Sequence, residues 1–308
     1  MAQEETLEAS MSGSVRSPEA AADTTKSTRF DIPLELLRMP KTGRAYDLSS
    51  GWWPGMPLAS GHPPFHVMTY RSPAGQRNQK DLRFLDDNPV NFGFISEFMM
   101  CTTHTGTHID ALAHITCGPQ SAWHGGFSSN EFLGDFGPLN NDASQLPPVI
   151  KRGLLMDIPR ALGVEHLAPH QGVGARELEA ACSKQGLAPR EDDLVLVRTG
   201  TMLRWPDPDG LAACEGSGLS LEGAQWLAAK GVAAFAGDNA ALEVAPSGIP
   251  GDPQPVHRFL IQEKGLLILE WVYPEELSRD DISEFLFICL PLTVRGATGS
   301  MVRPLAVV

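Results

Sequence analysis

The chain has 308 residues, of which 42% are apolar, and a formal net charge of −13. A chain of this length and composition buries a substantial globular core without disulfide or metal crosslinks. The acidic balance argues against nucleic acid and membrane surfaces as partners, because both are recognised by clustered Lys and Arg.

The first 28 residues are rich in Ala, Ser, Thr and Glu and contain no apolar segment typical of a secretory signal. We predict that residues 1–28 are a disordered leader that can be removed without loss of stability or turnover, since their composition cannot offset chain entropy. Residues 29–308 are expected to form one domain. Five cysteines without a Cys-x-x-Cys pair fit a reducing compartment, the cytoplasm.

From Phe30 onward, strand and helix patterns alternate. Strands are predicted over residues 45–48, 92–101, 153–157, 193–198, 232–236, 265–271 and 285–290. Helices are predicted over residues 175–185, 220–230 and 255–264. The Gly- and Pro-rich segments 60–91 and 118–148 are predicted to be long loops, and Gly172-Val173-Gly174 a turn. The alternation indicates an α/β fold with mixed strand pairing.

Three histidines and an aspartate lie within eleven positions: His104, His108, Asp110 and His114. Imidazole and carboxylate are the usual ligands of zinc and similar divalent ions. A regular helix would place Asp110 about 240° around the axis from His104, so one helix cannot bring all four together. Gly106 permits a sharp bend. We therefore predict a strand end and tight turn leading into a helix, with two ligand pairs closing on one cavity.

Neighbouring residues extend this hypothesis. Thr105 and Thr107 are expected to hold the ligating rings through hydrogen bonds. Cys101 and Cys117 flank the run, and they are expected to be small buried side chains, with thiolate ligation as the alternative. No Gly-x-Ser-x-Gly nucleophile motif and no His-Glu-x-x-His zinc-protease motif is present.

The run from His104 to His114 resembles the His-x-Gly-Thr-His-x-Asp-x-Pro-x-His signature of the metal-dependent cyclase family, which includes bacterial kynurenine formamidases and isatin hydrolases. Leu112 stands where the signature has Pro, which predicts an altered turn with the metal ligands retained. Further segments are similar to the family along most of the chain, at residues 46–49, 55–57, 237–239, 257–260, 269–270, 285–292 and 299–305.

The resemblance implies the fold and the roles of particular residues. The fold would be a single domain with a mixed β-sheet core, like a swivelling β/β/α domain, surrounded by helices. His104, His108 and Asp110 would hold the principal ion, zinc with manganese as the alternative. His114 and Glu270 would face a second ion, with Glu263 as the alternative to Glu270. His257 would transfer protons, with Asp110 and His114 acting beside it.

Aromatic residues on Gly- and Pro-rich segments are candidates for the wall of a substrate pocket: Trp52, Trp53, Phe65, Trp123 and Phe127. The expected function is hydrolysis of a small cyclic or aryl amide, imide or lactone by metal-activated water. Two alternatives stay open, a metal-dependent cyclase or dehydratase that acts on a small carbonyl compound and a non-catalytic metal-site binding protein. The resemblance implies that the chain associates with itself, and closed two-fold symmetry is the commonest outcome for soluble oligomers. A homodimer or a higher symmetric oligomer is therefore expected.

Overall fold

The computed structural model describes residues 30–308, so the leader predicted over residues 1–28 lies outside the described residues. The segment Leu34–Val308 forms one compact unit. Among the described residues, no helix has both the length and the apolar character needed to cross a bilayer.

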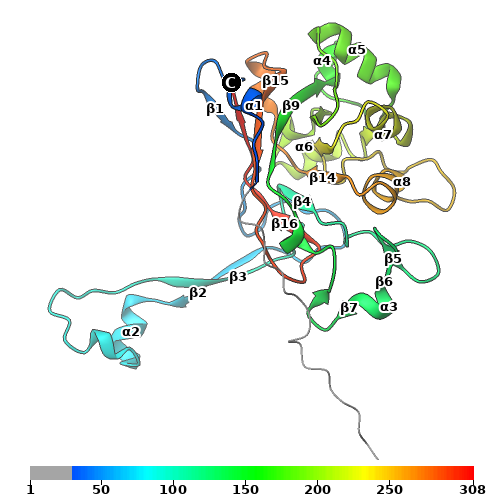
Figure 1. Ribbon diagram of the computed structural model, residues 1–308. Helices are drawn as coiled ribbons and strands as arrows, with labels where there is room; N and C mark the ends of the chain where they lie inside the picture. Colours follow the sequence, from blue (N-terminus) through cyan, green and yellow to red (C-terminus); the bar gives the residue numbers. More distant parts are fainter. Residues whose placement is uncertain (1–29) are drawn as a thin grey trace, which may run out of the picture. The chain divides into compact units, whose positions relative to one another are not determined.

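A nine-stranded mixed sheet forms the centre of this unit (Figure 1). Its middle contains four parallel strands: β9 (Val149–Asp157), β11 (Leu194–Arg198), β13 (Ala234–Gly237) and β14 (Leu267–Glu270). Antiparallel strands extend the sheet beyond β9, namely β15 (Glu284–Cys289), β17 (Leu305–Val307) and β1 (Ala45–Asp47). Beyond β14 lie β4 (His108–Asp110) and β16 (Gly299–Met301). The expected α/β fold with mixed pairing is confirmed.

The parallel strands are buried on both faces, which explains their continuous apolar sequences. On β11, Val195 and Val197 belong to one core cluster, whereas Leu194 and Leu196 belong to another. The first cluster also contains residues of the helices α5 (Ala175–Gln185), α7 (Leu221–Ala228) and α8 (Pro255–His257). These helices therefore cover one face of the sheet, as Figure 1 shows.

The second cluster fills the other face of the sheet. It contains Tyr46 of β1 and Ile109 of β4, together with Phe285 and Phe287 of β15. Strands β1 and β4 lie far apart in the strand order, yet their side chains share this cluster. The sheet therefore curls around its own core. Strands β14 and β4 pair directly, at the place where the histidine run enters the sheet.

Most predicted elements of the sheet and its helices are confirmed. Helix α5 coincides with residues 175–185 and ends at Gly186, which has a φ of 66°. Helix α7 lies within the predicted range 220–230 and begins after its N-cap Ser220, whose side chain accepts from the backbone N–H of Gly223. The helix predicted over 255–264 divides into α8 and the π-helix η5 (Arg258–Glu263).

The two predicted loops are wrong in part. Residues 60–91 contain β2 (His66–Arg71), α2 (Pro73–Gln79) and the short η2 (Arg83–Leu85). Strand β2 pairs with β3 (Ser96–Met100), which confirms the strand predicted over residues 92–101. Strand β2 itself is largely exposed, so no alternation of buried and polar residues marks it. Residues 118–148 contain short elements without readable periodicity: β5 (Ala122–Trp123), β6 (Phe127–Ser128), α3 (Ser129–Phe132), β7 (Leu133–Gly134), β8 (Gly137–Pro138) and η3 (Ala143–Gln145).

The remaining short elements connect these parts of the chain. Gly172-Val173, predicted to lie in a turn, forms the strand β10 (Gly172–Val173), which pairs with β12 (Gly218–Leu219). The other helices are α1 (Leu34–Leu37), α4 (Ile158–Leu162), η4 (Thr201–Arg204), α6 (Pro208–Ala212) and α9 (Glu275–Arg279).

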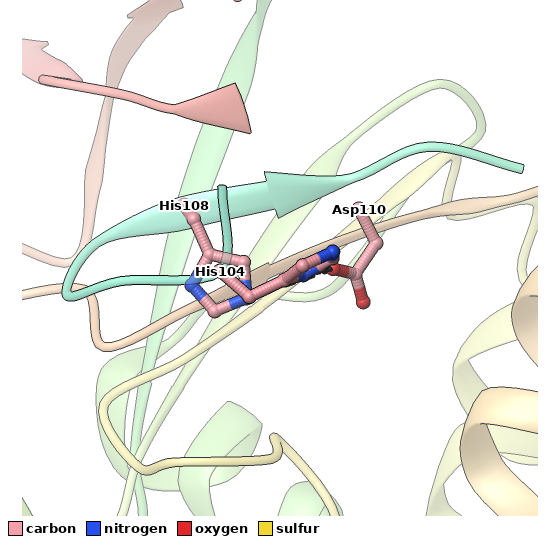
Figure 2. A group of neighbouring side chains, drawn as sticks. All are labelled: His104, His108 and Asp110. Carbon is pink, nitrogen blue, oxygen red and sulfur yellow. Dashed lines mark ion pairs between the residues drawn. The ribbon is translucent and has the colours of Figure 1, made fainter. Parts of the chain in front are cut away.

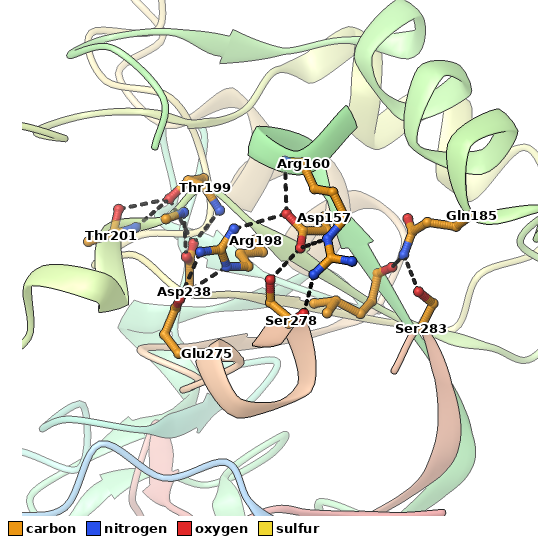
Figure 3. Close-up of polar contacts among 12 residues, drawn as sticks. Asp157, Arg160, Gln185, Arg198, Thr199, Thr201, Asp238, Glu275, Ser278 and Ser283 are labelled. Carbon is orange, nitrogen blue, oxygen red and sulfur yellow. Dashed lines mark hydrogen bonds and ion pairs between the residues drawn. The ribbon is translucent and has the colours of Figure 1, made fainter. Parts of the chain in front are cut away.

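A buried polar network joins the carboxyl ends of β9, β11 and β13 (Figure 3). The guanidinium of Arg198 donates to Asp157 Oδ1 at 2.9 Å and to Glu275 Oε2 at 2.7 Å. Directly after β13, the carboxylate of Asp238 accepts from the backbone N–H groups of Thr199 and Gly200. The network fixes the strand ends at the sheet edge that also carries Glu270.

Replacing Arg198 with Met should cost about 3–5 kcal/mol of unfolding free energy, because the buried carboxylate of Glu275 would lose its counter-charge and that of Asp157 would keep only Arg160. The matched control is Arg303→Met, which breaks an exposed pair with Asp47 and should cost less than about 1 kcal/mol. Denaturant unfolding of both variants measures the difference. Equal losses in the two variants would contradict a stabilising role for the buried network.

Candidate metal centre

The histidine run folds as a tight turn followed by a strand. Gly106 has a φ of 56°, and a Cβ there would lie 2.9 Å from both Met56 Cε and Ser50 Oγ, so the predicted bend is confirmed. The predicted helix after the bend is wrong. Residues 108–110 form β4, whose backbone pairs with β14 on one side and β16 on the other. Pairing on both sides satisfies the backbone groups that a helix would otherwise bond internally.

His104, His108 and Asp110 come together on one side of β4 (Figure 2). His108 and Asp110 are two residues apart and therefore share a face of the strand. Asp110 Oδ1 lies 2.9 Å from His104 Nδ1 and 3.6 Å from His108 Nε2. All three side chains are at least 95% buried. The strand and the turn thus bring the three residues together.

One nitrogen of each ring contacts a neighbouring oxygen outside the cluster, and the other nitrogen faces the carboxylates of the cluster. His104 Nε2 lies 3.0 Å from Thr298 Oγ1, and His108 Nδ1 lies 2.8 Å from the carbonyl oxygen of Gly106. Such contacts orient metal-binding imidazoles and set their tautomers. Gly299 permits the packing of His104, because a Cβ there would lie 2.6 Å from the ring.

The predicted contacts of Thr105 and Thr107 with the rings are wrong. Thr105 Oγ1 donates to the carbonyl of Thr102, and Thr107 Oγ1 donates to the carbonyl of Trp271. Both hydroxyls thus hold backbone segments and not imidazoles. Because Trp271 follows Glu270 directly, the contact of Thr107 positions the end of β14 against β4.

A second group of buried polar side chains faces Asp110. Glu270, at the end of β14, has Oε2 3.3 Å from His108 Nε2 and Oε1 2.9 Å from His257 Nε2. His257 Nε2 also lies 3.7 Å from Asp110 Oδ2. The ligand atoms available from Asp110, His257 and Glu270 lie within 4.8 Å of one another, as do those of His104, His108 and Asp110. Asp110 is common to both groups.

Glu243 holds His257 from the opposite side. Its carboxylate accepts the backbone N–H groups of Val256 and His257 at 3.0 and 3.1 Å, and it also pairs with His257 Nδ1. The sequence prediction missed Glu243. A signal for it was present, because it is the lone charged residue in the apolar run Ala241–Ala245, and a charge in such a run is usually buried and paired.

Two further histidine rings stack against His104. The ring of His114 lies 4.0 Å from it between centroids, and that of His62 lies 5.5 Å from it. Burial lowers the pKa of His114 to about 4, which leaves a neutral imidazole that can act as a ligand. His62 was not predicted, since nothing in the segment Gly61-His62-Pro63 marks it as part of a site.

The donor set of this cluster fits a divalent cation. The 2.9 Å contact between Asp110 Oδ1 and His104 Nδ1 is an ion-pair contact without hydrogen-bond geometry. Both oxygens of Asp110 and Nδ1 of His104 are therefore buried without a hydrogen-bond partner among the described residues. Burial by itself would raise the pKa of Asp110, but the imidazoles of His114 and His104 hold that pKa far below its usual range. A buried carboxylate that stays ionised needs a compensating positive charge. Two imidazoles and a carboxylate are the donors that zinc and similar ions take.

Three predicted alternatives lie elsewhere. Cys101 is half-buried with Sγ 3.8 Å from Met301 Sδ, and Cys117 pairs with Ala122 through the backbone. Neither thiol belongs to a group of converging ligand atoms among residues 30–308. Glu263 pairs with Arg258 at the protein surface, whereas Glu270 lies in the buried cluster.

The predicted pocket aromatics divide into two sets. Trp52 Nε1 donates to the carbonyl of Thr105 at 2.7 Å and so touches the histidine turn, and Trp53 contacts Trp205 edge-on at 5.6 Å. Phe65 and Trp123 are buried, and Trp123 and Phe127 belong to the β5–β6 hairpin. Of these five aromatic candidates, Trp52 is the one that hydrogen-bonds to the histidine turn.

The model of the Cyclase family matches residues 46–244, about two thirds of the chain. The chain belongs to this family. The matched segment includes the histidine turn, β4 and Glu243, whereas His257 and Glu270 follow it. The similarity that the sequence suggested is therefore confirmed.

Other proteins are similar to this chain in sequence or in fold. A curated relative from Oryza sativa subsp. japonica, Cyclase-like protein 2, is 29% identical over 211 residues, 68% of this chain and 63% of the relative's length. A crystal structure described as a novel cyclase has a TM-score of 0.76 at 25% identity and covers 89% of this chain and 92% of its own. Isatin hydrolase A from Labrenzia aggregata, bound to benzyl benzoate, has a TM-score of 0.62 at 18% identity, covering 85% and 93%.

Proposed function

We propose that the protein is a metal-dependent hydrolase that opens or cleaves a small cyclic or aryl amide, imide or lactone. The observation that carries the proposal is the carboxylate of Asp110. It is 1% exposed, both its oxygens lack a hydrogen-bond partner among the described residues, and it lies between two groups of ligand atoms. An arrangement of this kind is stable when a cation occupies it.

In this proposal His104, His108 and Asp110 hold the principal ion, and His114 and Glu270 face a second. Zinc is favoured over manganese because imidazole nitrogen is a better donor for zinc. A bound divalent ion would supply an acidified water and a polarised carbonyl group. The protein's own part is to orient the ligand nitrogens through Gly106 and Thr298 and to exclude bulk water by burial.

His257 is the proposed proton donor to the leaving nitrogen or oxygen. Its Nδ1 faces Glu243, whose carboxylate is anchored by two backbone N–H groups, so Nδ1 carries a proton and Nε2 faces the site. Burial opposes the charged imidazolium, but Glu243 and Glu270 raise the pKa of His257 well above its usual value. Asp110 or Glu270 would accept the proton of the attacking water.

The proposed substrate class rests on the site's surroundings and on the family. Trp52 and Trp53 lie on the segment that packs against the histidine turn, and aromatic side chains suit a flat, compact ligand. The fold is shared with isatin hydrolase A. We also propose that the protein works in the cytoplasm as a closed homo-oligomer.

An assay panel of N-formylkynurenine, isatin and simple lactones tests the function. The proposal predicts that one of these is converted to the free carboxylic acid with consumption of one water, and that the product carries label from ¹⁸O-water. A product formed without incorporation of label would favour a cyclase or dehydratase instead. A protein that binds the ion and converts none of the panel would contradict the proposed substrate class.

Glu243→Gln should lower turnover about ten- to hundredfold, the usual effect of removing a residue that orients a ligand or an acid at such a site. The amide keeps the shape but cannot hold the protonated imidazole as a carboxylate does. Glu263→Gln is the matched control, because Glu263 is on the surface, and it should leave turnover unchanged. Steady-state kinetics with parallel metal analysis measures both. A Glu243→Gln enzyme with full turnover would remove Glu243 from the proposed proton path.

A further inference from the structure

A cavity of about 470 Å³ lies on the central sheet, lined by residues of α1, β9, β15 and β17 and of the segments that precede β1, β11 and β15. Small-molecule sites have volumes in this range. Gly153, next to the lining residue Arg152, pairs with Leu194 at the start of β11, whereas Glu270 of the metal centre ends β14. The cavity therefore lies toward the amino ends of the parallel strands, and the metal centre lies at their carboxyl ends.

Arg152 is the buried polar side chain of this cavity and is 8% exposed. Its Nη1 donates to Asp193 Oδ2 at 2.7 Å, and its Nε donates to Glu284. Its Nη2 is buried and has no hydrogen-bond partner among residues 30–308. A buried donor without a partner costs free energy, because the group has lost its contacts with water. The two N–H groups of Nη2 therefore indicate an acceptor that the described part of the chain does not supply.

Three more cations line the same cavity: Arg38, Lys41 and Arg190. Arg190 is held beside Arg152, because Asp193, which pairs with Arg152, also accepts the backbone N–H of Arg190 at 2.6 Å. Within residues 30–308, the ion pairs of these four cations all belong to Arg152. The charges of the other three are thus available to an anion in the cavity.

The acidic groups of the lining are fewer. Glu284 already has a partner in the buried pair, and Glu35 is exposed. Val308 ends the sequence, and its oxygen accepts the backbone N–H groups of Thr42 and Gly43 at 3.1 and 2.8 Å. Including the carboxylate of Val308, the wall carries three anionic groups and four cations. An anion in the cavity therefore meets more cations than anions along the wall, although the net charge of the whole chain is −13.

The rest of the wall is apolar. Its side chains are Leu36, Met39, Ile282, Phe285 and Val307. Arg152 and Val307 both pair with Leu286, so the two side chains lie on the same face of the sheet. The cationic and apolar parts are thus neighbours in one cavity. This combination suits a molecule with an anionic end and an apolar body.

We propose that this cavity binds a small carboxylic acid with an apolar body, whose carboxylate contacts Arg152, Arg190 and Arg38. A carboxylate oxygen accepts from the N–H groups of Arg152 Nη2 and forms charge-assisted hydrogen bonds with the other guanidinium groups. The apolar body covers the apolar side chains of the wall. The hydrolysis proposed above releases acids of this class, so the cavity would take a product of that reaction. Binding of the acid does not depend on that function.

Isothermal titration calorimetry of the purified full-length protein with its bound metal tests the site, with octanoate and 2-naphthoate as probes. Both acids should bind with a dissociation constant below about 1 mM. Octan-1-ol has an apolar body without the charge, and inorganic phosphate has the charge without the body. Each of these two should bind at least about tenfold more weakly than octanoate.

Variants assign the binding to the cavity. Arg38→Gln combined with Arg190→Gln removes two exposed cations and leaves the buried ion pairs intact, so it should raise the dissociation constant of both acids at least about tenfold. Arg176→Gln is the matched control, an exposed arginine of α5 outside the cavity, and should leave the affinity unchanged. Arg152→Lys keeps a positive charge for its two carboxylate partners but removes Nη2, and it should also weaken both acids. If Arg152→Lys fails to fold, the double variant still decides.

Failure of both acids to bind would overturn the proposal. An unchanged affinity in the double variant would also overturn it, because the acids would then bind elsewhere, for example at the metal centre. Phosphate that binds as tightly as octanoate would leave only a general anion site, and the proposed ligand class would be wrong. Calorimetry needs no turnover, so a protein that binds the acids in this cavity but hydrolyses none of the assay panel would contradict the proposed function alone.

Discussion

Replacing His108 with Ala is expected to remove the bound metal and the activity together. His108 Nε2 lies 3.6 Å from Asp110 and 3.3 Å from Glu270, so it contributes to both sides of the cluster. Without His108, the buried carboxylates of Asp110 and Glu270 lose an imidazole that faces both of them. A metal site that lacks one of its ligands binds the ion weakly. Elemental analysis of the variant should show less than one metal ion per chain, and its turnover should fall to the rate of the uncatalysed reaction.

His166→Ala is the control for His108, since the His166 ring makes one contact with the carbonyl of Leu167 and lies outside the cluster. This control should keep its ion and its turnover. If His108→Ala retained a full equivalent of metal, the assignment of His108 as a ligand would be wrong. If it lost the metal yet kept full turnover, the metal would have no part in the reaction.

His257→Ala should lower turnover by about a hundredfold or more, the usual effect of losing a general acid or base, while the metal stays bound. His257 is fixed between Glu243, which contacts its Nδ1, and Glu270, which contacts its Nε2. Of these two ring nitrogens, Nε2 faces Asp110. Substrates with better leaving groups should be affected less, because their departure needs less protonation.

The same variant separates two roles for His257. Asp110, His257 and Glu270 form one of the two groups of converging ligand atoms, so His257 can also be considered as a ligand. Loss of the ion from His257→Ala would assign it to ligation. An equal loss of rate with good and poor leaving groups would exclude proton donation. Retained metal with a leaving-group dependence is the result that the proposed role requires.

Apolar periodicity was enough to predict the parallel strands in the middle of the sheet and the helices that cover them. Leu194 to Val197 are buried on both faces and α5 has a regular apolar face, so both stand out in the sequence. Strand β3 lies within the strand predicted over residues 92–101. Its partner β2 was missed because it is exposed on both faces, and a strand that buries neither face has no alternating pattern.

At the metal centre the sequence predicted which residues gather but not how the backbone brings them there. Gly106 indicated the bend, yet whether a helix or a strand follows depends on β14 and β16, which are more than 150 residues away. Glu243 and His62 reach the cluster through tertiary packing alone. The spacing of residues in the sequence cannot indicate such partners. The one sequence signal for Glu243 is its position as a single charged residue in an apolar run.

The central claim, that Asp110 and its neighbours hold a catalytic divalent ion, is tested most directly by removal and return of the metal. Activity on a converted substrate is measured before dialysis against a chelator, after it, and after addition of zinc or manganese, with the ion content determined at each stage. We predict that activity disappears with the ion and returns when about one or two equivalents per chain are restored. Full activity in protein that contains less than about a tenth of an equivalent of metal ion per chain would contradict the central claim.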